Sequence, residues 1–123
     1  MNVCEDYSDS QVEKEPSMDE VNKLDWKRYT QLVPKWQERY MERLLQEYAG
    51  IIAETDHASN RFWKLKERIS EDVRKPGVQL EMRKSEMVMD LICMLRDGTI
   101  TLNDLDGFSD SVMIKILARI TDG

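Results

Sequence analysis

The chain has 123 residues, of which 41% are hydrophobic and 34% are charged. This length suits one domain with one core, and a charged share above the usual quarter is typical of amphipathic helices with solvated faces. No apolar run approaches the ~20 residues that a membrane-spanning helix requires, and the acidic opening of the chain does not resemble a signal peptide. We therefore expect a cytoplasmic protein without a membrane partner.

The net charge of −6 is confined to the start of the chain. Eight of the 24 acids and two of the 18 bases fall in residues 1–25, so residues 26–123 hold 16 of each. The opening segment has few apolar side chains and cannot bury enough surface to offset the entropy lost on ordering. We predict a disordered acidic tail over residues 1–20 and a single helical domain over residues 21–123.

A helical spacing of apolar residues begins near residue 24. A proline inside a helix removes a hydrogen bond and clashes one turn back, at a cost of about 3 kcal/mol, so Pro34 predicts a break. We expect a short helix over 24–31 and a long helix that starts near Pro34. The apolar residues of this long helix share one face as far as Ile52.

Two further long helices are predicted in the middle of the chain. The first begins at Asp56 or Ser59 and ends at Pro76-Gly77. Its apolar stripe, which is expected to face the core, consists of Ala58, Phe62, Leu65, Ile69 and Val73. The second spans about 79–97, and Gly98 supplies the left-handed residue that ends it.

The last quarter of the chain has the clearest helix signals. Thr101 and Asp104 have the spacing of a capping box, and a final helix is predicted from Asp110 to about Thr121. Leu91 and Leu117 stand at the centres of their apolar stripes, so both are expected in the core. The predicted fold class is all-α, a compact helical bundle of three long and two short helices.

No pattern in the sequence predicts catalysis, a metal site or a cofactor. Residues 97–105 are similar to the second half of an EF-hand calcium loop, but the first and third ligand positions would be Cys93 and Leu95, which offer no oxygen. The single histidine, His57, stands at a helix entry without a sequence sign of a catalytic partner. Cys4 belongs to a polar segment and Cys93 to an apolar one, which argues against a disulfide framework.

Aromatic and methionine residues in excess of what a small core can cover predict a surface that contacts another protein, or a second copy of the chain as a homodimer. The candidates for this surface are Trp26, Tyr29, Trp63, Met82 and Met89. Ordinary core packing of these side chains is the alternative. The sequence does not indicate the partner.

A second candidate surface is basic. Arg61, Lys64 and Arg68 share one helix face through their i, i+3, i+7 spacing, and such a stripe can contact phosphates. The surrounding acids dilute the stripe, and the acidic tail on the same chain would compete for it. A nucleic-acid partner is therefore not expected, and a nucleic-acid-associated or nucleic-acid-mimicking factor, for example an inhibitor of a host defence or DNA-processing protein, stays the alternative function.

Three segments carry a resemblance to a known group of proteins: Ala58–Leu65, Pro76-Gly77-Val78, and Met94–Leu102 with its continuation to Phe108-Ser109. Over about residues 35–120 the chain resembles a family of small uncharacterised helical proteins from Gram-positive bacterial genomes and their mobile elements. The resemblance implies a bacterial, cytosolic accessory protein that acts by binding others, and it supplies no catalytic motif. We predict a non-enzymatic protein-binding module, with self-association as one form of that function.

Overall fold

The computed structural model describes residues 22–122. These residues form four α-helices and two short 3-10 helices, and they contain no strand, so the all-α prediction is confirmed for them. The elements in chain order are α2 (Lys23–Ile52), α3 (Ala58–Asp72), η3 (Lys84–Glu86), α4 (Met87–Asp97), η4 (Leu102–Leu105) and α5 (Asp110–Asp122). The acidic tail predicted for residues 1–20 lies outside the described residues.

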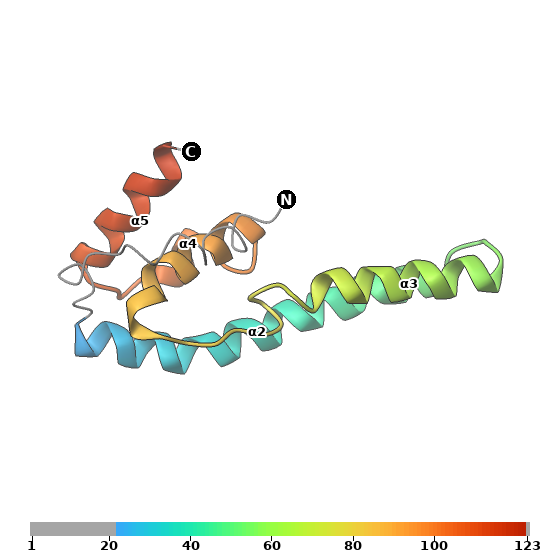
Figure 1. Cartoon of the computed structure of the whole chain (residues 1–123), viewed down its shortest axis with the longest axis horizontal. Coiled ribbons are helices and arrows are strands. Elements are labelled where there is room, and N and C mark those ends of the chain that lie inside the picture. Colours follow the sequence, from blue (N-terminus) through green and yellow to red (C-terminus); the bar gives the residue numbers. More distant parts are fainter. Residues whose placement is uncertain (1–21, 123) are drawn as a thin grey trace.

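The described residues divide into a helical hairpin and a body that share α2 (Figure 1). α3 folds back along the C-terminal half of α2, whereas α4 and α5 lie at its N-terminal half. At 30 residues, α2 is about 45 Å long, and it extends beyond the helices of the body. The predicted compact bundle is therefore wrong in shape, because the hairpin projects from the body.

The predicted break at Pro34 is also wrong, because α2 continues through that residue. The pyrrolidine ring of Pro34 is exposed, while Val33 and Trp36 beside it are buried in one continuous face. Burying a large apolar side chain contributes about 1.5–3 kcal/mol, so a few such residues outweigh the proline penalty. The helix begins where the side chain of Asn22 accepts a hydrogen bond of 2.7 Å from the backbone N–H of Leu24.

The predicted helix over 79–97 is too long at its start. Residues 79–83 are not helical, and α4 begins only at Met87, after the short η3. The segment before η3 runs back beside α2 (Figure 1), where Gln37 Nε2 donates a hydrogen bond of 2.9 Å to the carbonyl oxygen of Pro76. Arg83, the last residue before η3, has extended backbone angles, with φ of −135° and ψ of 138°.

The core lies between the N-terminal half of α2 and the helices α4 and α5. Its members are Tyr29, Val33, Trp36, Met87, Leu91, Ile92, Met94, Ile100, Leu105, Phe108, Val112 and Ile116. Leu91 is 0% exposed, as predicted. Leu117 is 41% exposed, so its predicted core position is wrong. The reason is that α5 packs through Val112 and Ile116, and Leu117 lies a quarter turn away from that row.

Local signals placed the connections of the body correctly. Gly98 ends α4 with φ of 80°, as predicted, and the capping box of Thr101 and Asp104 is present at the start of η4. Cys93 is 2% exposed, which agrees with a place in the core. It is also disulfide-bonded, contrary to the prediction.

Candidate functional site

Polar contacts fix the register of the α2–α3 hairpin. Arg61 Nη1 donates to the carbonyl oxygen of Ile52 at 2.7 Å, and Arg68 Nη2 pairs with Glu47 Oε1 at 2.6 Å. Near the base of the hairpin, the Tyr48 hydroxyl donates to Asp72 Oδ2 at 2.6 Å. These contacts show that α3 faces α2 through one row of its residues, namely Arg61, Leu65, Arg68 and Asp72.

The predicted basic stripe is part of this register. Arg61, Lys64 and Arg68 lie near one another, but each is engaged within the chain, since Lys64 Nζ pairs with Glu54 Oε2 at 2.8 Å. Hydrogen bonding to Glu47 raises the pKa of Arg68. Burial alone would raise the pKa of Asp72, but the Tyr48 hydroxyl and the Arg68 charge outweigh it and lower that pKa. The stripe therefore joins α3 to α2.

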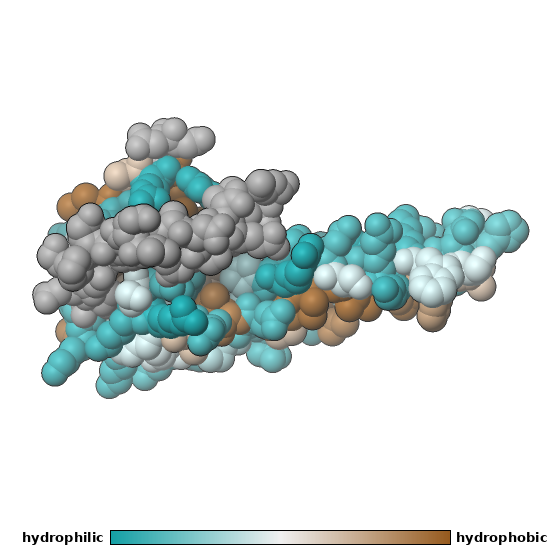
Figure 2. All heavy atoms as spheres, in the orientation of Figure 1, coloured by the Kyte–Doolittle hydropathy of each residue, from teal (hydrophilic) through white to brown (hydrophobic). Residues whose placement is uncertain are grey.

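One side of the hairpin is apolar and exposed, and no element of residues 22–122 packs on it. Its members, which we call the hairpin face, are Leu45 (60% exposed) and Ile52 (54%) from α2, Phe62 (61%) and Ile69 (43%) from α3, and Val73 (42%), the residue that follows α3. In each helix these residues stand one position beyond the row that contacts the other helix. One position beyond the contact row is one flank of each helix. In an antiparallel pair of right-handed helices, these two flanks lie on the same side of the pair. Figure 2 shows hydrophobic residues gathered along this edge of the projecting hairpin.

The prediction that Phe62, Ile69 and Val73 face the core is therefore wrong. α3 packs on α2 through the row that includes Leu65 and Arg68, and this contact covers one flank of the stripe. The flank that carries Phe62 and Ile69 has no helix over it among the described residues. A stripe wider than one helix contact stays partly open to solvent.

The five residues predicted as a partner surface do not form one surface. Tyr29 is 0% exposed, and Trp26 and Met89 are partly buried against the core. Met82 is 36% exposed and lies in the connection before η3. Trp63 alone belongs to the hairpin, where it is 62% exposed and meets the ring of Phe62 edge-on at 5.0 Å. Of the five predicted residues, only Trp63 borders the hairpin face, and none of the five is a member of that face.

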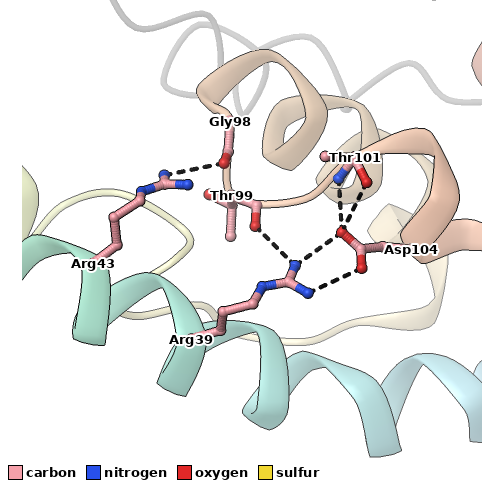
Figure 3. Close-up of polar contacts among 6 residues, drawn as sticks. All are labelled: Arg39, Arg43, Gly98, Thr99, Thr101 and Asp104. Atoms are coloured by element: carbon pink, nitrogen blue, oxygen red, sulfur yellow. Dashed lines mark hydrogen bonds and ion pairs between the residues drawn. The ribbon is translucent and has the colours of Figure 1, made fainter.

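A cluster of polar contacts ties the body to the hairpin helix α2 (Figure 3). The guanidinium of Arg39 contacts both carboxylate oxygens of Asp104 at 3.0 and 2.8 Å, and it also donates to the Thr99 carbonyl at 3.3 Å. Arg43 Nη2 donates to the carbonyl oxygen of Gly98 at 3.1 Å. Burial alone would raise the pKa of Asp104, but its bonds to Arg39 and Thr101 lower it. The segment that resembles a calcium loop thus anchors the body on α2.

One buried carboxyl group titrates near neutrality. Asp90 of α4 is 5% exposed, and its Oδ2 accepts a hydrogen bond of 3.0 Å from the Tyr29 hydroxyl. Burial raises its pKa to about 7; the Tyr29 hydrogen bond and Arg83 act in the opposite direction, and the charge of Glu86 adds to the increase. Between about pH 4 and pH 7 the unfolded chain loses this proton while the folded chain keeps it, so the contribution of Asp90 to stability falls as the pH rises.

We expect Asp90→Asn to remove this pH dependence. The asparagine oxygen can still accept from Tyr29, and no charge is buried at high pH. The variant should match the wild type near pH 3, where the aspartate is protonated in both the folded and the unfolded chain, and exceed it by up to a few kcal/mol near pH 8. Urea denaturation of both proteins at the two pH values measures the difference. The pKa shifts of Asp72 and Asp104 are present in both proteins and therefore cancel in this comparison. If the free energies of unfolding of the two proteins differed by the same amount at both pH values, the assignment would be contradicted.

The remaining candidates are His57 and the acidic residues. His57 is exposed at the residue that precedes α3, as the sequence predicts. Residues 22–122 bring no three His, Cys, Asp or Glu side chains into an arrangement that could hold a metal ion. Within the same residues, no helix combines the length and the apolar character that crossing a membrane requires.

Comparisons with protein-family models, with curated proteins and with solved structures found no match for this chain.

Proposed function

We propose that the chain is a non-enzymatic protein-binding module that docks a partner protein on the hairpin face. The observation that supports this most is the exposure of five large apolar side chains, 42–61% each, on one side of a projecting hairpin. Contiguous exposed apolar patches on soluble proteins mark interaction sites, whereas scattered single residues do not.

The hairpin also has the rigidity that a docking surface requires. Contacts of Arg61 and Arg68 hold α3 on α2, and Lys64 pairs with Glu54 in the connection between the two helices. At the base, Tyr48 bonds Asp72 and Gln37 bonds the Pro76 carbonyl. A preorganised surface loses less conformational entropy when a partner binds, which favours affinity.

The basic stripe offers less support for the nucleic-acid alternative. Its three cations have acceptors inside the hairpin, and a phosphate would have to compete with Glu47, Glu54 and the backbone carbonyl of Ile52. No observation in the described residues favours a phosphate ligand over these partners.

The test compares two pairs of substitutions in a co-purification from the native host. Leu45→Glu with Ile69→Glu places charge on the hairpin face, while Leu102→Glu with Ile114→Glu makes the same change at body residues that are 45% and 66% exposed. Immobilised wild type and the body variant should retain the same protein, and the face variant should lose it. All three should have equal helicity, because the changed side chains are exposed. Retention by the face variant would contradict the proposal.

A further inference from the structure

We propose that the occupant of the hairpin face is a second copy of this chain, so that two hairpins form a four-helix bundle. The inference rests on the proposed function and names its partner. The two copies are related by a two-fold axis that runs parallel to α2 and α3. In this arrangement α2 of each copy lies against α3 of the other.

The register of the hairpin makes the face self-complementary. Glu47 pairs with Arg68, and the Ile52 carbonyl accepts a hydrogen bond from Arg61. These two contacts identify which residues of α2 and α3 lie at the same height along the hairpin. By this register Ile52 lies level with Phe62, and Leu45 lies level with Ile69. The face thus has apolar layers, each with one residue from either helix.

A two-fold rotation about an axis parallel to the helices keeps the height of every residue and exchanges α2 with α3 across the interface. Ile52 then meets Phe62 of the second copy, and Leu45 meets Ile69 of the second copy. Every apolar layer meets an identical layer, as in an isologous interface. Neighbouring helices are antiparallel, as in an up-and-down four-helix bundle.

The exposed area suits a dimer of moderate affinity. At roughly half of the ~150 Å² that a large side chain can bury, the five members of the face expose about 400 Å² per copy. Pairing would hide roughly 800 Å² from these residues, and Trp63 with the surrounding polar side chains would add more, up to the ~1,000–1,200 Å² at which specific interfaces begin. We expect a dissociation constant in the micromolar range.

The charges near the face are compatible with self-pairing. The five members of the face are uncharged, but Lys66 follows Leu65 of the contact row and is exposed on the same flank of α3, so each copy brings one cation to the interface. The two-fold rotation sets this lysine opposite α2 of the other copy and not opposite the second lysine. The charged side chains of the hairpin that form ion pairs, among them Glu47, Glu54, Lys64 and Arg68, are already neutralised within each copy.

Sedimentation velocity of the full chain from about 1 to about 200 µM tests the inference, since this range brackets micromolar dissociation constants. The wild type and the body variant (Leu102→Glu with Ile114→Glu) should pass from monomer to dimer. The face variant (Leu45→Glu with Ile69→Glu) should stay monomeric, and the milder Ile69→Gln should weaken the dimer about tenfold. Circular dichroism checks that each variant retains the wild-type helicity.

A wild type that stays monomeric over the whole range would overturn the inference, and so would a dimer that persists in the face variant. The proposed function fails separately. If the wild type is monomeric and still retains a different host protein through the hairpin face, the function stands and the second copy is excluded as its partner.

Discussion

Replacing Leu91 with alanine is expected to lower the free energy of unfolding by about 2–5 kcal/mol. Leu91 is 0% exposed at the centre of α4, where it packs in the core shared by α2 and α5. The truncation removes buried apolar surface and leaves a cavity that the neighbouring side chains fill only in part. Denaturation by urea, followed by circular dichroism, measures the change through the midpoint at a constant slope.

Leu117→Ala is the matched control for this change. The same atoms are removed from α5, but Leu117 is 41% exposed, so the loss should stay below about 1 kcal/mol. Both leucines occupy apolar stripes in the sequence, and only the packing distinguishes them. Equal losses for the two variants would show that α5 is rotated from the position described above.

Gly77→Ala is expected to destabilise the chain by about 1–3 kcal/mol or more through overpacking. A Cβ atom at residue 77 would lie 2.6 Å from Cγ and 2.7 Å from Cε2 of Tyr40. The Tyr40 side chain is 4% exposed, and its ring is not the flexible end of a side chain that could move aside. The connection after α3 would have to shift away from α2, and thermal denaturation should record a lower melting temperature.

Gly50→Ala is the control for this substitution, because a Cβ atom there has no neighbour within 4 Å. Gly50 lies inside α2, where alanine is favoured over glycine by roughly 0.5–1 kcal/mol. The two glycine-to-alanine changes should therefore have opposite signs. A destabilising Gly50→Ala or a neutral Gly77→Ala would contradict the packing at the base of the hairpin.

The sequence predicted those parts of the fold that depend on nearby residues. Gly98 ends α4 because glycine itself can adopt a positive φ. Thr101 and Asp104 form a capping box by hydrogen bonding across three residues, so both features could be predicted from nearby sequence. The backbone conformation at Pro34 and over residues 79–83 depends on contacts with parts of the chain that are distant in sequence. Burial of Val33 and Trp36 in the core keeps α2 continuous, whereas residues 79–83 run beside α2 without forming a helix.

The hairpin face was missed for a related reason. The periodicity of Phe62, Ile69 and Val73 shows that one side of α3 is apolar, but it does not show whether the chain has another helix to cover that side. One signal was available. Leu45 and Ile52 stand beside the buried row of α2, so the apolar sector of that helix is wider than one helix contact requires.

Site-directed photo-crosslinking tests the central claim, that the hairpin face is where this chain contacts a protein. A photoreactive residue replaces Ile69 on the face in one variant and Glu71 on the opposite flank of α3 in a second variant, and both are illuminated in the native host. The account predicts protein adducts from residue 69, with a second copy or another protein, and few or none from residue 71. Equal yields of adduct from the two positions, or no adduct from residue 69, would contradict the claim.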